Sequence, residues 1–214
     1  MSNSTEHLNA LKDIRNMMEK STRFVSLSGF SGVFAGIFAL CGAFAAHLFT
    51  YANQTNTQIP YYEFLMSDAK YINLTTLHFY ILDALTVLVL SVSVSSILSI
   101  RKAQKEEVKI WDKTAQRLFI NMMIPLVAGG LFCLMLIMHG SVGLVAPAML
   151  IFYGLALINA SKYTFEDIRF LGILEIALGL VASVFIGYGL WFWAIGFGIL
   201  HIVYGVLMYF KYEK

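Results

Sequence analysis

Charged residues are scarce in this sequence, and their scarcity excludes an ordinary soluble domain. Of the 214 residues, 13% are charged and 58% are apolar, and the mean hydropathy is +0.71. Soluble domains average about 25% charged and about 45–50% apolar residues. Since a soluble core could not bury this excess of apolar side chains, the composition indicates a membrane protein.

Cysteines and catalytic motifs are scarce as well. The two cysteines, Cys41 and Cys133, fall in different apolar segments and lack the spacing typical of a zinc or redox site. The sequence has no nucleophile elbow, no phosphate-binding glycine loop and no dinucleotide-binding motif. These absences argue against the common classes of soluble enzyme and favour a protein that is not an enzyme.

Long apolar segments account for most of the chain. About 20 apolar residues, at a rise of about 1.5 Å each, cross a hydrocarbon core of about 30 Å. The segments that meet this criterion are 25–49, 74–100, 118–138, 142–160, 168–188 and 190–210. The first begins too late and is too long for a cleaved signal peptide. The sequence therefore predicts an all-α, polytopic membrane protein with six transmembrane helices in residues 25–214.

The distribution of Lys and Arg predicts the orientation of these helices, because basic residues are enriched in cytoplasmic loops. All of the 15 Lys and Arg residues except Lys70 lie on one side of the predicted membrane. Lys70 belongs to the long loop 50–73, which this topology places outside. Both termini are therefore expected to be cytoplasmic, and the basic residues indicate orientation rather than a nucleic-acid-binding surface.

The chain ahead of the first segment has a different pattern. Residues 1–24 repeat apolar side chains at helical spacing between charged ones, which is typical of an amphipathic helix lying in the cytoplasmic interface. A helix that docks a partner protein is the alternative. Between the transmembrane segments, the turns 139–143 and 187–189 are short enough to make their flanking helices antiparallel neighbours, so three hairpins are expected.

Small residues recur where helices should touch. Gly29 and Gly36 in the first segment are seven residues apart, as are Gly172 and Gly179 in the fifth. This spacing puts each pair near one helix face, where it permits close approach of a neighbouring backbone. The shared spacing could reflect an internal repeat, but ordinary helix packing is the interpretation we favour.

Ionisable residues inside transmembrane helices are costly and usually functional. In the second segment, Asp83 shares a sector of about 100° with Thr86 and Ser93, which predicts a polar stripe along that helix. Glu175 and His201 are each 13 residues from Tyr188 at the tip of the last hairpin. They should therefore lie at the same depth and face each other, as a proton-sharing pair or as a structural clamp between helices.

Three histidines lie near the predicted outer face, together with Asp83. Imidazole and carboxylate groups are the usual ligands of Zn²⁺, so His47, His78, Asp83 and His139 are candidate metal ligands. No metal-binding motif supports this set, and histidines at helix ends also reach interfacial water. A b-type haem held by His47 and His139 is a further alternative.

Two stretches carry a resemblance to a known family. They are 17–32, with Met-Met-Glu-Lys-Ser and then Ser-Leu-Ser-Gly-Phe-Ser-Gly, and 150–164, with Leu-Ile-Phe-Tyr-Gly-Leu-Ala-Leu-Ile-Asn-Ala-Ser-Lys-Tyr-Thr. Over most of its length the chain resembles a family of uncharacterised six-span membrane proteins from Bacteroidetes bacteria, which implies a location in the bacterial inner membrane. The glycine-rich residues 171–209 are also similar in composition to HdeD-type short-repeat membrane proteins, although Glu175 and His201 depart from that pattern.

The sequence leads to three functional hypotheses. The first is transport or sensing of protons, a small ion or a small solute through a polar path formed by Asp83, Thr86, Ser93, Glu175 and His201. The second is a non-catalytic scaffold that binds a cytoplasmic protein through the basic residues 101–117 and the N-terminal helix. The third is an intramembrane metal-dependent hydrolase that uses the histidines. All three hypotheses place the protein in the lipid bilayer. They leave open whether the chain assembles into a homo-oligomer.

Overall fold

The computed structural model describes residues 28–57, 74–105, 107 and 111–214, and all regular structure in those ranges is helical. The predicted all-α fold is confirmed for them. The amphipathic segment 1–24 and most of loop 50–73 lie outside the described residues. The long helices are α2 (Gly29–Thr57), α4 (Leu74–Lys105), α5 (Lys113–Met138), α6 (Val145–Ala160) and α7 (Asp167–Val184), and the last helical stretch comprises α8 (Gly189–Trp193), η3 (Ala194–Leu200) and α9 (His201–Tyr212).

Several of these helices are long and apolar enough to cross a membrane. In the described part of the chain they are the five stretches Gly29–Ala52, Leu77–Lys105, Lys113–Met138, Val142–Ala160 and Gly189–Tyr212. Helix α7, which corresponds to the predicted segment 168–188, is 18 residues long and includes Asp167, Arg169 and Glu175. It is long enough to cross a membrane, but these three charged residues are more than the other five stretches carry in their apolar cores, so α7 is not counted with them.

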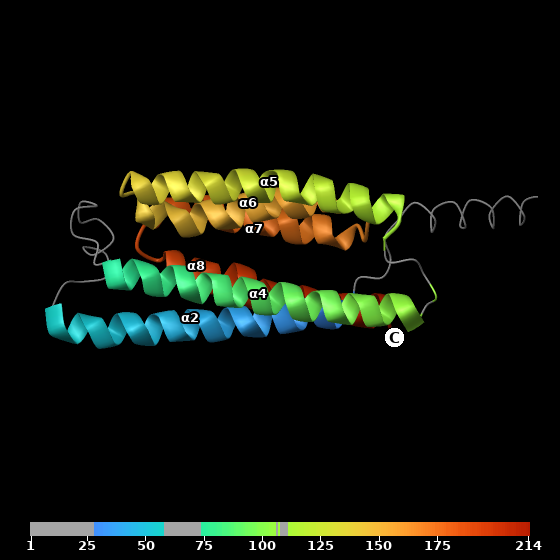
Figure 1. The fold of residues 1–214 in the computed structure, drawn as a ribbon, viewed down its shortest axis with the longest axis horizontal. Helices are drawn as coiled ribbons and strands as arrows, with labels where there is room; N and C mark the ends of the chain where they lie inside the picture. The colour runs from blue at the N-terminus through green and yellow to red at the C-terminus, as the bar shows by residue number, and fades with distance from the viewer. Residues whose placement is uncertain (1–27, 58–73, 106, 108–110) are drawn as a thin grey trace, which may run out of the picture.

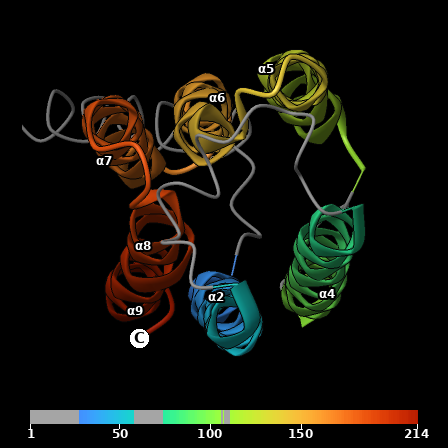
Figure 2. The ribbon, with the colours of Figure 1, turned by 90° about the vertical axis from the view of Figure 1, so that its left-hand side faces the viewer.

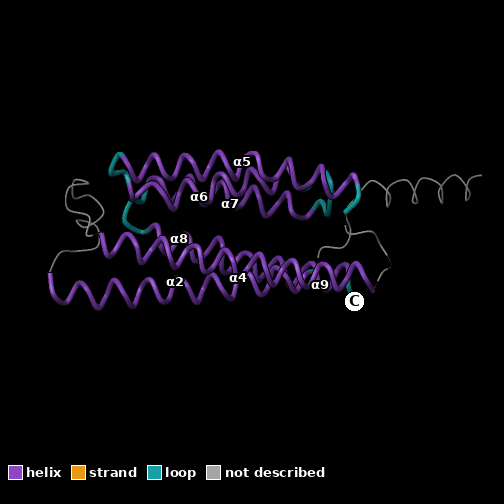
Figure 3. Tube along the Cα trace, viewed as in Figure 1, coloured by secondary structure: helices purple, strands orange, loops and turns teal. Residues whose placement is uncertain are grey.

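The helices run side by side along the long axis of the molecule and form two layers (Figures 1, 2 and 3). We call α5, α6 and α7 the α6 layer, and α4, α2 and the α8–η3–α9 stretch the α2 layer. In each layer the helix that gives it its name packs against both neighbours. Because α4 packs mainly on α2 and α5 mainly on α6, the layers meet chiefly where α6 and α7 face the last helical stretch.

The basic residues of the described helices collect at one end of the molecule. The end of α4, the start of α5 and the C-terminus all lie there (Figure 1). These helix ends carry Arg101, Lys102, Lys105, Lys113, Arg117, Lys211 and Lys214. The fold therefore gathers these predicted cytoplasmic charges, and we call this the basic end.

Glycines bring helices together within each layer. In the α6 layer, a Cβ on Gly172 would lie 2.7 Å from the carbonyl oxygen of Gly154, so α6 and α7 touch backbone to backbone. In the α2 layer, a Cβ on Gly29 would lie 2.7 Å from the carbonyl oxygen of Gly205. The expected hairpin of α7 with the last helix is therefore only part of the packing, because α7 packs mainly on α6 and the last stretch packs mainly on α2.

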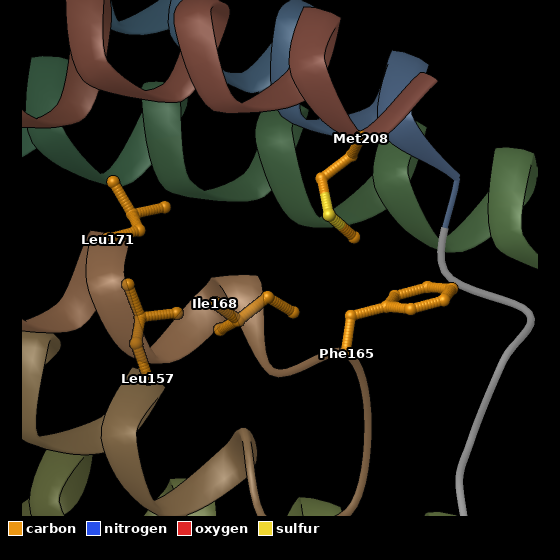
Figure 4. Close-up of a cluster of buried hydrophobic side chains, with 5 residues drawn as sticks. All are labelled: Leu157, Phe165, Ile168, Leu171 and Met208. Atoms are coloured by element: carbon orange, nitrogen blue, oxygen red, sulfur yellow. The ribbon is translucent and has the colours of Figure 1, made fainter. Parts of the chain in front are cut away.

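A cluster of buried apolar side chains joins the layers toward the basic end (Figure 4). It consists of Leu157, Phe165, Ile168, Leu171 and Met208. Met208 comes from α9 in the α2 layer, whereas Leu157, Ile168 and Leu171 come from α6 and α7. Tyr153, Leu200 and Tyr204 pack against this cluster and extend it toward the middle of the bundle, where the buried polar groups lie.

Candidate functional site

Glu175 lies in the interior of the bundle. It is on the same face of α7 as Gly172 and Gly179, three residues before it and four after it, and both glycines pack against α6. The side chain is 0% exposed, and neither carboxyl oxygen has a hydrogen-bond partner among the described residues. An ionised carboxylate in such a place lacks the hydrogen bonds that would offset its loss of hydration. The packing around Glu175 therefore accommodates the neutral, protonated acid.

His201, at the start of α9, is an ionisable group of the opposite layer that lies beside this carboxyl group. Its Nδ1 atom is 3.6 Å from Oε1 of Glu175 and 2.9 Å from the carbonyl oxygen of Gly196. Because a carbonyl oxygen only accepts, Nδ1 carries the hydrogen and donates it to Gly196. Nε2 then accepts from the hydroxyl group of Tyr153, at 2.7 Å. A neutral imidazole thus has both of its nitrogens satisfied.

The backbone beside these groups is a π-helix, η3, which covers Ala194–Leu200. A π-helical turn is wider than an α-helical one and occurs frequently at functional sites. Here it places the Gly196 carbonyl against the His201 ring five residues later. A Cβ on Gly196 would lie 2.5 Å from Oε2 of Glu175, so only glycine leaves room for the carboxyl group at this position.

Aromatic rings pack against the buried histidine. The His201 ring lies 5.3 Å from that of Tyr153 and is stacked at 6.0 Å on that of Phe197, measured between ring centroids. Tyr153 and Phe197 are themselves 5.0 Å apart. We call Glu175, His201, Tyr153 and Gly196 the buried polar site. It contains two groups that can each hold or release a proton, close together and buried.

No family model, curated protein or solved structure matches this chain. The resemblance to the Bacteroidetes family therefore stays a prediction, and the function has to be argued from the residues themselves.

The structure brings Glu175 and His201 together, as their positions in the last hairpin indicated, but the stripe on α4 is separate. Asp83 is half-buried, and its carboxyl oxygens lie beside Gly42 of α2. Thr86 and Ser93 are exposed, and the Thr86 hydroxyl donates to the Leu82 carbonyl of its own helix. The described side chains do not join Asp83, Thr86 and Ser93 to the buried polar site in a single path.

The candidate metal ligands are not brought together. His47, His78 and His139 are all exposed. His47 lies against Trp191 at a ring distance of 5.6 Å, and His139 Nδ1 is 2.8 Å from the Met135 carbonyl oxygen of its own helix. Within the described part of the chain, no three His, Cys, Asp or Glu side chains are placed to hold a metal ion. The predicted convergence of His47, His78, Asp83 and His139 is therefore wrong, because α2, α4 and α5 present these side chains to different surroundings.

Sequence reasoning missed two residues of the site, Tyr153 and Gly196. Tyr153 could have been found by applying hairpin arithmetic to the turn near Tyr163. Tyr153 is 10 residues before that turn and Glu175 is 12 after it, since 163 − 153 = 10 and 175 − 163 = 12. The two residues should therefore share a depth. Gly196 had no comparable signal, because its role depends on the π-helix.

Two ionic clusters lie at the basic end. Lys211 and the Tyr212 hydroxyl group donate to Asp167, at 2.8 and 2.6 Å, which connects α9 to the start of α7. Partial burial alone would raise the pKa of Asp167, but these hydrogen bonds and the Lys211 charge leave that pKa below its usual value. Separately, Glu213 Oε1 accepts from Lys102 at 3.1 Å and from the Gly29 backbone at 2.6 Å. Together the clusters hold α2, α4, α7 and α9 at this end.

Proposed function

We propose that this chain is a multi-pass membrane protein that transports or senses protons through the Glu175–His201 pair. The observation that carries the proposal is the fully buried Glu175 carboxyl group, whose oxygens have no hydrogen-bond partner among the described residues. Groups of this kind are rare within membrane proteins and mark proton relays and transport pathways. A histidine 3.6 Å away is a second proton acceptor at the same depth.

The geometry favours the proton over a metal cation as the species bound. A metal ion would need several oxygen or nitrogen ligands around it. At Glu175 the Nδ1–H of His201, 3.6 Å away, is a donor that would repel a cation, and Gly196 and Leu150 pack beside the carboxyl group. A proton needs neither additional ligands nor additional space.

The proposal includes a topology. Helix α7 has 18 residues, so at about 1.5 Å per residue it is about 27 Å long and nearly matches a hydrocarbon core of about 30 Å. With α7 as a sixth span, the chain crosses the membrane six times and the basic end faces the cytoplasm, as does the C-terminus. The resemblance in 17–32 and 150–164 supports the bacterial inner membrane as the location.

A flux measurement tests the transport form of this proposal. Purified protein is reconstituted into liposomes with a trapped pH indicator, and an imposed pH gradient should decay faster than in empty liposomes. Glu175→Gln should abolish the increase, because an amide keeps the shape of the acid but cannot release the proton. Asp83→Asn is the matched control, since Asp83 lies outside the buried polar site.

The contrary results are equally specific. Equal proton flux through wild-type protein and Glu175→Gln would show that the carboxyl group is not on the path. Flux no faster than in empty liposomes would contradict transport, and a cytoplasmic protein that co-purifies through 101–117 would then favour the scaffold.

A further inference from the structure

The buried polar site belongs to both layers of the fold. Tyr153 on α6 and Glu175 on α7 come from the α6 layer, whereas Gly196 on η3 and His201 on α9 come from the α2 layer. The histidine lies 2.7 Å from the Tyr153 hydroxyl group and 3.6 Å from the Glu175 carboxyl group. Both contacts therefore cross from one layer to the other. Separating the layers would break them.

The packing within a layer differs in kind from the packing between layers. Within layers, glycines bring backbones into contact, with Gly154 against Gly172 in one and Gly32 against Gly205 in the other. Between layers, α4 and α5 have their main partners elsewhere, and the contacts run from α6 and α7 to the α8–η3–α9 stretch, chiefly through side chains. Since backbone seams resist deformation more than side-chain contacts do, each layer is expected to move as a unit.

We propose that Tyr153 is a positioning residue that couples protonation of the Glu175–His201 pair to separation of the two layers. This inference rests on the proposed function and adds to it the residue that transmits the change. Tyr153 is the α6 residue that hydrogen-bonds to the imidazole, and it does so at the nitrogen that carries no hydrogen.

The hydrogen bonds show why the contact responds to a proton. In the neutral histidine, Nδ1–H donates to the Gly196 carbonyl and Nε2 accepts from the Tyr153 hydroxyl. A second proton on the ring must bind at Nε2, which then becomes a donor. The Tyr153 oxygen would have to accept instead, and its own hydrogen would lose its present acceptor. Protonation of His201 thus reverses or breaks the hydrogen bond that joins α6 to α9.

Few other ionisable groups on the neighbouring elements face the histidine. The titratable side chains that the packed elements bring to this region are Tyr153 from α6, Glu175 from α7 and Tyr204 from α9 itself. From η3 come the Gly196 carbonyl and the Phe197 ring. Helix α2 presents Gly32 to the His201 backbone, and its first described titratable residue beyond that point is Cys41, more than two turns away. The response to pH is therefore assigned to the Glu175–His201 pair.

Distance measurements between the layers test this inference. Spin labels are attached at Leu88→Cys on α4 and Ile124→Cys on α5, two exposed positions on different layers, after Cys41→Ser and Cys133→Ser remove the native thiols. In the full-length protein in lipid nanodiscs, the label distance should change between about pH 5 and about pH 8. His201→Gln, whose amide cannot take up a second proton, should hold one distance throughout.

Tyr153→Phe removes the hydroxyl and keeps the aromatic ring against Phe197. It should move the midpoint of the distance change by about half to one pH unit, the size of shift expected when one hydrogen bond to a titrating group is lost. Tyr80→Phe is the matched control, since Tyr80 is a half-buried tyrosine whose hydroxyl pairs with Thr50 instead. It should keep the wild-type midpoint.

The results that overturn the inference differ from those that overturn the proposed function. Proton flux that depends on Glu175, with a label distance that is constant across pH, would leave the function standing and refute the coupling. A Tyr153→Phe midpoint equal to wild type would remove Tyr153 from the account. If Tyr153→Phe does not fold, the dependence of the wild-type label distance on pH still tests the inference, because a constant distance refutes it.

Discussion

Oε1 of Glu175 lies 3.6 Å from Nδ1 of His201, and the two residues belong to different helical layers. The histidine is fully hydrogen-bonded as a neutral ring, to Gly196 and Tyr153, while the carboxyl group has no hydrogen-bond partner among the described residues. This asymmetry means that the acid depends on its proton to remain buried at low cost. Loss of that proton would leave a charge for which His201 is the nearest compensating group.

Substitution of Gly196 should disturb the site directly. In Gly196→Ala, the new Cβ would lie 2.5 Å from Glu175 Oε2 and 2.5 Å from Leu150 Cδ2, and both neighbours are fully buried. We expect a loss of about 1–3 kcal/mol of stability, typical of overpacking, and loss of proton flux. Thermal unfolding in detergent measures the first effect. The control is Gly130→Ala, because no atom lies within 4 Å of a Cβ at that position, and it should be stable.

The seam between α6 and α7 gives a second prediction. Gly172→Ala places a methyl group 2.7 Å from the Gly154 carbonyl oxygen, and a backbone atom cannot move aside cheaply. The unfolding temperature should fall clearly below that of the wild type and of Gly130→Ala. Unchanged stability in Gly172→Ala would indicate that α6 and α7 are not in backbone contact.

The Asp167 cluster predicts a pH dependence at the basic end. Its hydrogen bonds with Lys211 and Tyr212 outweigh burial and lower the pKa of Asp167. A lowered pKa stabilises the fold above the unfolded value of about 3.9 and ceases to do so as the pH falls through the folded value. Asp167→Asn should therefore unfold at a lower temperature than wild type at neutral pH, and the difference should begin to shrink below about pH 4 and vanish once the pH is below the folded pKa of Asp167. Glu107→Gln, an exposed carboxyl change, should show no such pattern.

Glu213 should be important for the packing of α2. Its carboxylate accepts from the first backbone N–H of α2, on Gly29, and from Lys102 of α4, so a charge lies at the positive end of the α2 dipole. Glu213→Gln removes that charge and should cost about 1–3 kcal/mol. Lys105→Met is the control. Lys105 is an exposed basic residue at the same end of α4 as Lys102, and the variant should unfold like wild type.

Metal removal should have no effect on this protein. His47, His78, Asp83 and His139 do not converge, and the described residues form no group of three metal-binding side chains. Prolonged dialysis against a chelator should leave both the unfolding temperature and the proton flux unchanged. Stoichiometric zinc in the purified protein, lost together with activity on dialysis, would contradict this prediction.

The sequence was informative where a tight turn links two helices. The turn at Tyr188 makes distance along the chain a measure of depth, and this arithmetic alone placed Glu175 opposite His201. Hydropathy likewise predicted the all-α fold, since apolar segments of this length have few other stable forms in a membrane. Both inferences depend on local properties of the chain.

The other features of the site depend on which helices are neighbours, and no local pattern in the sequence indicates that. The histidines near one predicted face were grouped by depth, but α2, α4 and α5 turn them toward different surroundings. Thr86 and Ser93 shared a sector with Asp83, yet only Asp83 turns toward α2. The π-helix is not predictable from the sequence either, because one widened turn leaves the hydropathy pattern unchanged. The role of Gly196 depends on that turn, so the sequence does not indicate it.

Infrared difference spectroscopy of the protein in lipid tests the central claim most directly, since it observes the neutral carboxyl group of Glu175 itself. We predict a carboxylic-acid carbonyl band that is present at neutral pH and disappears only as the pH is raised above neutral, that is absent in Glu175→Gln and that persists in Asp83→Asn. A spectrum in which this band does not change with pH, or is unaffected by Glu175→Gln, would contradict the assignment of Glu175 as the proton-binding group.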